Sequence, residues 1–260
     1  MASYEDFALV YDQFMDNISY EEWAKFIIGQ LKKEHINEGI VLDLACGTGI
    51  LTELLSESGY DMIGVDSSEE MLSIAREKQM EAGKTDILYL EQDIRSFELY
   101  GTVKAIVCVC DSLNYITKKD ELFKVFSLVK NYLDPDGIFI FDINSEYKYE
   151  KILGDNTFAE SREDCAFIWD NFYDEDTKIN EYDLTLFIKE DDTFARSVET
   201  HLERAYSLDE IYSLLGKAEL EVLAIYDDYS RDYVTRKSER ITFVVKNIND
   251  ERKMKLLENQ

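Results

Sequence analysis

The sequence predicts an α/β fold in which a mostly parallel sheet has helices on both faces and carries an inserted antiparallel β meander. Apolar runs alternate with amphipathic segments between Ile40 and Ile143, as crossover connections require. A glycine-rich turn follows the first apolar run and leads directly into a helix. After Ser145 the alternation stops, and three aromatic and β-branched runs follow one another. Together these observations indicate a Rossmann-like core with an insertion.

The core elements are expected where hydrophobic periodicity and turn residues coincide. Two helices, Tyr4–Met15 and Tyr20–Lys33, precede the first strand. The alternating strands and helices that follow are expected at Ile40–Leu44, Ile50–Ser58, Met62–Val65, Glu69–Met80, Ile87–Glu91, Val103–Cys110, Glu121–Tyr132 and Ile138–Ile143.

The insertion is expected as a three-stranded meander because acidic turns separate its runs. Its strands are Cys165–Tyr173, Lys178–Lys189 and Thr193–Ala205. The helix Leu208–Gly216 restores the alternation. Two last strands, expected at Glu221–Ile225 and Ile241–Val245, complete the sheet. A charged tail follows at Asp250–Gln260.

The chain is long enough for one sizeable core and a small appended unit. We therefore expect a helical lid and cofactor-binding core in residues 1–145, a β cap in residues 146–206, and completion of the core with the tail in residues 207–260. The cap lies near the carboxyl ends of the strands, so it either covers a ligand pocket or forms a homodimer interface.

The balance of 55 acidic against 28 basic residues gives a formal net charge of -27. Such a surface repels nucleic-acid phosphates and anionic lipid head groups, so we expect neither nucleic acid nor a membrane as partner. The 4 cysteines lack C-x-x-C spacing, and the N-terminus lacks a basic segment before an apolar one. A reducing, cytoplasmic location fits these features best, and no metal site is expected.

The turn after the first strand, Asp43-Leu44-Ala45-Cys46-Gly47-Thr48-Gly49, lets a ligand approach the backbone closely. A dinucleotide fingerprint would have a third glycine where this chain has Thr52. The carboxylate of Asp43 would repel a pyrophosphate but attract a sulfonium or ammonium group. The charge therefore favours S-adenosylmethionine, with S-adenosylhomocysteine as the product, over NAD.

Two further acids follow the next two strands. Asp66 stands about twenty residues after the turn, where such folds place an acid on the ribose hydroxyls. Asp93 and Ile94 could bind an exocyclic amine and cover an adenine face. An NAD-binding oxidoreductase would share the ribose acid, so this residue alone does not separate the two classes.

In these motifs the chain resembles the class I S-adenosylmethionine-dependent methyltransferases. The resemblance covers most of residues 36–145 and extends to Gly64-Val65-Asp66-Ser67-Ser68 with Met71, and to Leu133-Asp134-Pro135-Asp136-Gly137. The opening, Phe7–Asp12 and Tyr20–Trp23, is more loosely similar to uncharacterised bacterial members and to N-methyltransferases of amino sugars and glycine. The resemblance implies a small-molecule acceptor, with nitrogen favoured over oxygen.

The resemblance also implies site residues. Those expected to contact the cofactor are Tyr11, Asp43, Ala45, Cys46, Gly47, Gly49, Asp66, Ser67, Met71, Asp93, Ile94 and Cys110. The loop after the fourth strand, which lies near the transferred methyl in this class, offers Asp111, Asn114 and Tyr115 to the acceptor. It lacks the Asn-Pro-Pro-Tyr signature of enzymes that methylate base amines.

His201 is the candidate base. If its run is a strand, His201 shares a polar face with Glu199 and Glu203, opposite Val198 and Leu202. Such a face is either solvated or, if the meander covers the pocket, directed inward. A non-catalytic S-adenosylmethionine-binding regulatory protein is the remaining alternative, because the cofactor motif survives loss of chemistry. An open cavity near Tyr115 and His201 would favour the enzyme.

Overall fold

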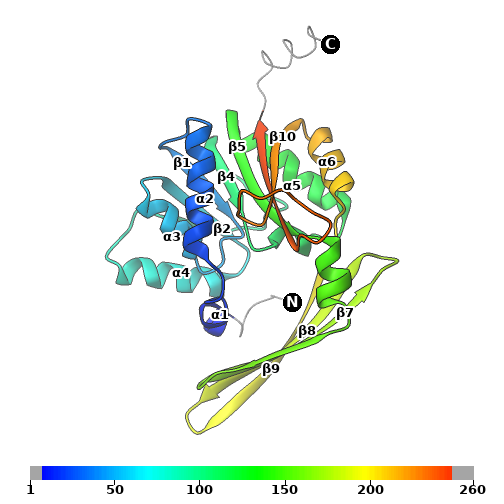
Figure 1. The fold of residues 1–260 in the computed structure, drawn as a ribbon. Coiled ribbons are helices and arrows are strands. Elements are labelled where there is room, and N and C mark those ends of the chain that lie inside the picture. The colour runs from blue at the N-terminus through cyan, green and yellow to red at the C-terminus, as the bar shows by residue number, and fades with distance from the viewer. Residues whose placement is uncertain (1–7, 248–260) are drawn as a thin grey trace.

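The computed structural model describes residues 8–247 and contains two β sheets (Figure 1). The larger sheet has the strand order β10-β11-β5-β4-β1-β2-β3. Strands β1 to β5 pair in parallel, whereas β11 is antiparallel to both β5 and β10. The predicted mostly parallel sheet is therefore confirmed, with one reversed strand. Its strands are β1 (Ile40–Leu44), β2 (Asp61–Asp66), β3 (Leu88–Glu91), β4 (Val103–Cys108), β5 (Leu133–Asn144), β10 (Leu220–Asp227) and β11 (Arg240–Asn247).

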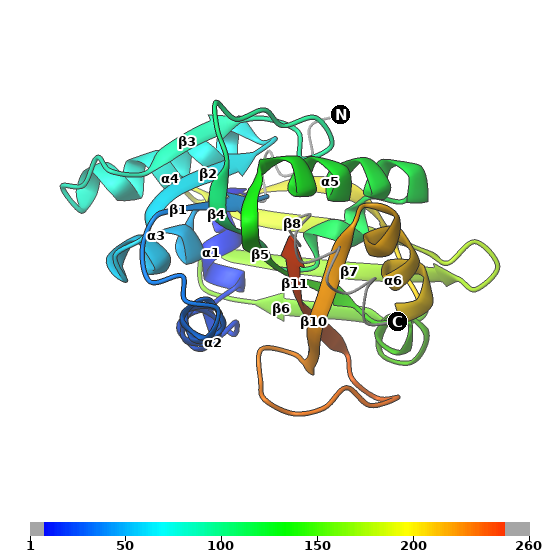
Figure 2. The ribbon, with the colours of Figure 1, turned by 90° about the horizontal axis from the view of Figure 1, so that it is seen from above.

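Helices cover both faces of this sheet (Figure 2). One face carries α2 (Tyr20–Lys33), α3 (Ile50–Glu57) and α4 (Glu69–Glu81), and the other carries α5 (Lys119–Tyr132) and α6 (Leu208–Lys217). The five helices begin and end within two residues of the predicted bounds. Their apolar stripes are clear in the sequence because only one side of each helix meets the sheet.

The strand residues alternate between these two layers. Val41 packs with the α2 to α4 layer, while Leu42 and Leu44 pack with the α5 and α6 layer. All three side chains are fully buried. A parallel strand that is covered on both faces therefore reads as a continuous apolar run, and β1 is predicted with its correct bounds.

The inserted sheet lies across the carboxyl ends of the core strands (Figure 1) and has the order β6-β7-β8-β9. Its strands are β6 (Thr157–Ser161), β7 (Cys165–Asp174), β8 (Ile179–Glu190) and β9 (Thr193–Arg204). The antiparallel meander is confirmed, but it has four strands rather than the predicted three. The sequence of β6 is short and polar, and β6 pairs through Phe158 opposite Trp169. Such a strand has little hydrophobic periodicity of its own, and it forms because it pairs with β7.

The bounds of several other elements differ from the prediction, most of all at β5, which begins at Leu133 rather than Ile138. Strand β4 ends at Cys108 rather than Cys110, because Cys110 and Asp111 both have positive φ, 57° and 50°. Helix α1 covers Ala8–Phe14, and the predicted start at Tyr4 lies outside the described residues, as does the predicted tail Asp250–Gln260. Within residues 8–247, no helix is long and apolar enough to cross a membrane.

Two glycines with positive φ, Gly49 and Gly59, should differ in how well they tolerate replacement by alanine. A methyl group at Gly49 would lie 2.4 Å from the Tyr89 hydroxyl at φ +80°, whereas one at Gly59, φ +96°, would meet nothing within 4 Å. Gly49→Ala should lower the free energy of unfolding by about 2–4 kcal/mol, since it adds a clash to backbone strain. The control Gly59→Ala should lose only about 1 kcal/mol. Equal losses in urea titrations would contradict this account of Gly49.

Candidate functional site

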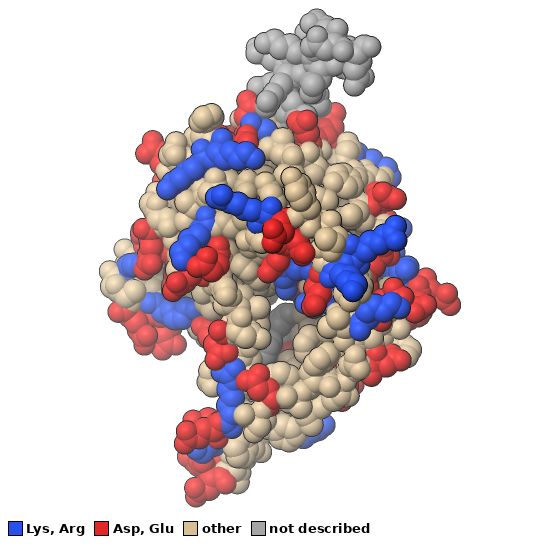
Figure 3. Space-filling view, in the orientation of Figure 1, with Lys and Arg blue, Asp and Glu red and all other residues tan. Residues whose placement is uncertain are grey.

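A cavity of about 630 Å³ lies between the carboxyl ends of the core strands and strand β9. The molecule is hollowed between the core and the inserted sheet (Figure 3). Helices α1 and α2 contribute Tyr11 and Tyr20 to its wall. The core and β9 contribute Asp43, Ala45, Cys46, Gly47, Thr48, Ile50, Leu51, Asp66, Ser67, Met71, Asp93, Ile94, Arg95, Val109, Cys110, Ser112, Tyr115, Ile116, Thr200, His201 and Leu202.

The two glycines of the first turn have different roles. Gly47 lines the cavity, and a Cβ added there would meet nothing within 4 Å. Its φ of +53° is a left-handed conformation that glycine adopts without strain. Gly49 does not line the cavity but allows close packing against Tyr89. Thus Gly47 keeps the ligand side of the turn open, and Gly49 fits the turn onto the core.

Asp66 fixes the shape of this turn. One carboxylate oxygen accepts a hydrogen bond from the Gly47 N–H at 2.8 Å, and the other accepts from the Ser68 N–H at 2.9 Å. Burial raises the pKa of Asp66, and the backbone donors oppose that rise. The same side chain lines the cavity, so it links the turn to any ligand that lies there.

Asp43 is a buried acid with one oxygen available to a ligand. It is 1% exposed, and its Oδ2 accepts a hydrogen bond from Thr52 Oγ1 at 2.6 Å. Its buried Oδ1 has no hydrogen-bond partner among the described residues. Burial, together with the charge of Asp66, raises the pKa of Asp43 to about 7. A cation placed beside Oδ1 would offset both effects, so this end of the cavity suits a positively charged ligand.

The third acid is already paired. Asp93 lines the cavity and binds the guanidinium of Arg95, with Arg95 Nε 2.9 Å and 3.0 Å from its two oxygens. This hydrogen bonding lowers the pKa of Asp93. Arg95 also reaches Glu121 at 3.3 Å. A ligand amine at Asp93 would therefore share an oxygen that Arg95 already contacts, beside the apolar side chain of Ile94.

The end of the cavity nearest β9 is lined by Tyr115 and His201, and Tyr182 and Glu199 contact these two residues. The Tyr115 and Tyr182 hydroxyls are hydrogen-bonded to each other, and the ring of His201 stacks on Tyr182 with centroids 4.8 Å apart. His201 Nε2 lies 3.3 Å from Glu199 Oε2. His201 is only 3% exposed, so the polar face of β9 points inward at this position rather than into solvent.

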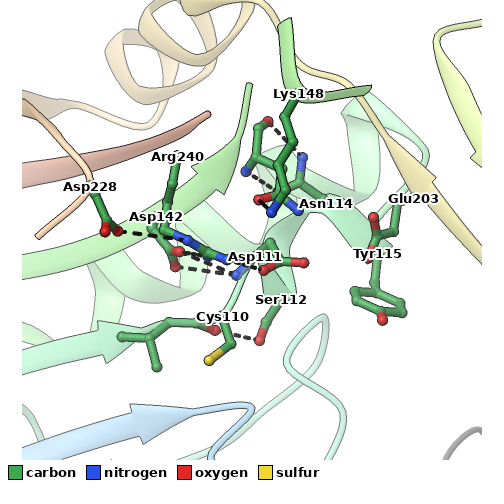
Figure 4. A network of polar contacts seen from close by, with 12 residues as sticks. Cys110, Asp111, Ser112, Asn114, Tyr115, Asp142, Lys148, Glu203, Asp228 and Arg240 are labelled. Carbon is green, nitrogen blue, oxygen red and sulfur yellow. Dashed lines mark hydrogen bonds and ion pairs between the residues drawn. The ribbon is translucent and has the colours of Figure 1, made fainter. Parts of the chain in front are cut away.

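Asp111 lies behind the cavity wall. Its Oδ1 accepts a hydrogen bond from Arg240 Nη2 at 2.8 Å, and Arg240 also binds Asp142 (Figure 4). The described cavity wall includes the neighbouring Cys110 and Ser112 but not Asp111. Asp111 is thus positioned to hold the turn between these two residues.

Asn114 and Glu203 are also part of the supporting framework. Asn114 is fully buried, donates hydrogen bonds to the backbone oxygens of Asn144 and Arg204, and accepts one from the Asn144 N–H. This arrangement ties the loop to β5 and β9. Glu203 is buried and accepts a hydrogen bond from Tyr149 at 2.8 Å. Burial and the nearby charge of Asp111 raise the pKa of Glu203, and Tyr115 is also a hydrogen-bond partner.

Helix α1 joins the core to the inserted sheet beside the cavity. Asp12 accepts hydrogen bonds from Thr48 Oγ1 at 2.5 Å and Lys78 Nζ at 3.0 Å. On the other side, Phe14 packs edge-on against Phe167 of β7 with centroids 4.9 Å apart. These contacts hold in place the helix that contributes Tyr11 to the cavity wall.

Most of the site residues expected from the sequence line one cavity. Of the site residues expected from the sequence, Gly49, Asp111 and Asn114 are absent from the described wall. Several residues that hydrogen-bond or pair with them were not predicted. Arg95 was within reach of sequence reasoning, because it stands two residues after Asp93. Tyr182 and Arg240 were not, because strand pairing and chain reversal bring them in from distant positions.

Comparisons with known proteins show which proteins this chain is similar to. A family model described as a methyltransferase domain matches residues 41–137. A Bacillus subtilis (strain 168) protein named as a methyltransferase, YqeM, is 35% identical over 92% of this chain and 95% of its own length. A solved S-adenosylmethionine-dependent methyltransferase from Clostridium acetobutylicum ATCC 824 is 35% identical, covers 95% of this chain and 99% of that chain, and superimposes with a TM-score of 0.87.

A more distant relative has a stated substrate. The glycine/sarcosine N-methyltransferase of Halorhodospira halochloris is 30% identical over 55% of this chain and 53% of its own length. These relatives are methyltransferases, so they favour the sulfonium cofactor over the dinucleotide alternative.

The buried Asp43 predicts how cofactor binding depends on pH. Its pKa near 7 means that the carboxyl is increasingly protonated below that pH, whereas a cationic ligand favours the carboxylate. The affinity for S-adenosylmethionine should therefore fall up to about tenfold per pH unit below 7, with proton release on binding. Calorimetry between pH 5.5 and 8 measures both quantities.

Two variants test the source of that dependence. Asp43→Asn should bind more weakly and with a flatter pH profile, since no proton leaves position 43. Asp61→Asn removes an exposed acid at the other end of β2 and should keep the wild-type slope. A wild-type affinity that does not change with pH, or a slope undiminished in Asp43→Asn, would rule out this role for Asp43.

Proposed function

This chain belongs to the S-adenosylmethionine-dependent methyltransferases, and from that premise we propose that it methylates a nitrogen of a small-molecule acceptor. The observation that carries the proposal is the continuous cavity that joins the acid-lined glycine turn to Tyr115 and His201. A non-catalytic binding protein would not need an open cavity beyond the cofactor end. The choice of nitrogen is supported by the relative that is named for methylating glycine and sarcosine.

The residues present fit the cofactor. Asp43 Oδ1, buried and without a described partner, would hold the cationic methionine end beside the open backbone at Gly47. We propose that Asp66 holds the ribose, that Asp93 and Ile94 hold the adenine, and that Tyr11 covers the site. The remaining expected contacts are Ala45, Cys46, Ser67, Met71 and Cys110, which all line the cavity. Gly49 would act through the shape of the turn.

S-adenosylmethionine, when bound, supplies a methyl carbon whose bond to sulfur breaks with the electron pair left on sulfur, while the acceptor nitrogen lone pair forms the new bond. The protein's main contribution is alignment and exclusion of water. His201 would take the proton that the methylated nitrogen loses. With Nε2 facing Glu199 at 3.3 Å, a neutral ring that carries its proton on Nε2 presents Nδ1 as the basic atom.

The other two catalytic candidates would have different tasks. Tyr115 lines the cavity beside His201, with ring centroids 5.9 Å apart, and would contact the acceptor directly. Asp111 would be a positioning residue, since its carboxylate contacts Arg240 and its turn carries Cys110 and Ser112. We also propose the division into a core with its lid (1–145), a cap (146–206) and a completing segment (207–260).

The proposal also covers the kind of partner that the protein binds and its cellular location. A net charge of -27 supports a small-molecule acceptor over nucleic acid or a lipid surface as partner. The 4 cysteines are all free thiols, which supports a reducing, cytoplasmic location.

We propose that the outer face of the inserted sheet forms a homodimer interface. Phe172, Phe194 and Val198 are 62%, 52% and 45% exposed on this face, while the inner face of β9 contributes His201 to the cavity wall. Apolar side chains gathered on one sheet face disfavour a lone monomer. A two-fold pairing of identical faces would bury them without an additional partner.

Methyl transfer can be tested directly with methyl-labelled S-adenosylmethionine and a panel of glucosamine, glycinamide, 1,4-diaminobutane and glycerol. Label should appear on nitrogen, and His201→Asn should lower kcat about 10²–10³-fold because the proton acceptor is lost. His35→Asn is the matched control, because the second histidine is exposed and asparagine tolerates its positive φ of 63°. Transfer to oxygen alone, or full activity in His201→Asn, would refute this mechanism.

The molecular mass in solution tests the proposed dimer. Light scattering should give about twice the chain mass of 30.3 kDa, and Val198→Asp should return it to the monomer mass, since a charge would be buried in the interface. Tyr233→Asp, at a residue 89% exposed outside the inserted sheet, should leave the dimer intact. A monomeric wild-type protein at micromolar concentration would overturn the proposed interface.

A further inference from the structure

Tyr182 contacts two residues of the cavity wall, Tyr115 and His201, although Tyr182 itself does not belong to the described wall. Its hydroxyl is hydrogen-bonded to the Tyr115 hydroxyl. Its ring is stacked on the His201 ring, with an interplanar angle of 19° and centroids 4.8 Å apart. One side chain behind the wall is therefore in contact with both groups that the proposed function directs at the acceptor.

The stack follows from the register of the inserted sheet. Tyr182 of β8 and His201 of β9 lie directly opposite each other in this antiparallel pair, so their side chains are on the same face of the sheet. This is the inner face, because Tyr182 is 8% exposed and His201 is 3% exposed. Strand pairing itself therefore places the two rings together.

The Tyr182 ring is held in place by its other neighbours. Strand β8 is paired on both edges, with β7 and with β9. Trp169 of β7 meets the Tyr182 ring edge-on, with centroids 5.4 Å apart. Val10 and Phe14 of helix α1 belong to the same buried cluster as Tyr182. A side chain packed in this way keeps one rotamer, so it can orient the groups that it touches.

The direction of the His201 ring depends on more than one contact. Its Nε2 lies 3.3 Å from Glu199 Oε2, but a contact at one ring atom does not define the plane of an imidazole. Stacking on Tyr182 defines that plane, and Tyr115 meets the ring edge-on with centroids 5.9 Å apart. A reacting group has to be held within about 0.5 Å and about 20° of its productive geometry.

We propose that Tyr182 is a positioning residue for methyl transfer, and that its ring and its hydroxyl have separate tasks. The ring holds the His201 imidazole in the plane in which Nδ1 takes the proton that the methylated nitrogen loses. The hydroxyl holds the Tyr115 side chain that contacts the acceptor. This inference rests on the proposed methyltransferase function and deepens it. Loss of the ring should slow the reaction, whereas loss of the hydroxyl alone should weaken acceptor binding.

Two substitutions at position 182 separate these tasks. Kinetics are measured with S-adenosylmethionine and the amine that the wild-type protein methylates fastest. Tyr182→Leu should lower kcat about 10–100-fold, because the proton acceptor turns away from its productive direction. Tyr182→Phe keeps the stacked ring, so kcat should stay within about threefold of the wild type while KM for the amine rises at least about threefold.

Tyr173→Leu is the matched control. Tyr173 lies on β7, is 9% exposed, and has its ring stacked on Tyr149, which is not part of the described cavity wall. This variant should keep the wild-type kcat, although it removes a similarly buried tyrosine from the same sheet. An unchanged kcat in Tyr182→Leu, or equal losses in the two leucine variants, would overturn the proposal.

The histidine signals in NMR spectra test the same contact without any acceptor. The chain has only 2 histidines, so isotope-labelled histidine gives two sets of ring signals, which His201→Asn assigns. The ring current of a stacked aromatic side chain shifts nearby protons upfield. The His201 ring protons should therefore lie upfield of those of the exposed His35. This difference should remain in Tyr182→Phe and Tyr173→Leu and largely disappear in Tyr182→Leu; a difference that survives there would refute the positioning role.

The methyltransferase function can fail separately from this inference. Binding of S-adenosylhomocysteine is measured first by calorimetry, and the variants should bind it as tightly as the wild type, since positions 173 and 182 lie outside the described cavity wall. A wild-type protein that does not bind it would refute the function and the inference together. If the wild type binds it but methylates no amine, the proposed transfer to nitrogen is refuted, and the histidine signals still decide whether Tyr182 holds His201.

Discussion

The guanidinium of Arg240 is the interaction on which the architecture of the site depends. It binds Asp142 and Asp111, and its charge lies 5.2 Å from the Trp23 ring centroid. These contacts connect strand β11 to β5 and to the turn after β4 (Figure 4). The contact with Trp23 connects β11 to helix α2 as well. Without a cation between them, two buried carboxylates would repel each other in a medium of low polarity, at a cost of several kcal/mol.

That cation also stabilises a strained turn. Cys110 and Asp111 both have positive φ, which side chains other than glycine adopt only at a cost of about 1–3 kcal/mol each. The turn presents Cys110, Ser112 and Tyr115 to the cavity. The reversed strand β11 therefore contributes to the site, although none of its residues belongs to the described wall.

The two ends of the cavity have complementary tasks because they are built by different parts of the fold. The parallel strands bring Asp43 and Asp66 together at their carboxyl ends, where backbone N–H groups and open space meet. The inserted sheet brings His201 and Glu199 on an edge strand that faces this end. The same kind of core can therefore carry different sites, because an insertion adds side chains at the ligand end without changing the core strands.

The sequence by itself determined the parallel core, the inserted meander and the acid-lined turn after the first strand. Apolar runs buried on both faces, the turn around Gly47 and the acids Asp43, Asp66 and Asp93 are local signals that need no distant partner. Only the tertiary structure decided which way the polar face of β9 points. The strand pattern of Glu199, His201 and Glu203 is the same in either orientation, and the packing of β9 against the cavity, not its periodicity, directs it inward. It likewise decided that Asp111 binds Arg240, because residues 129 positions apart meet only when the chain has folded.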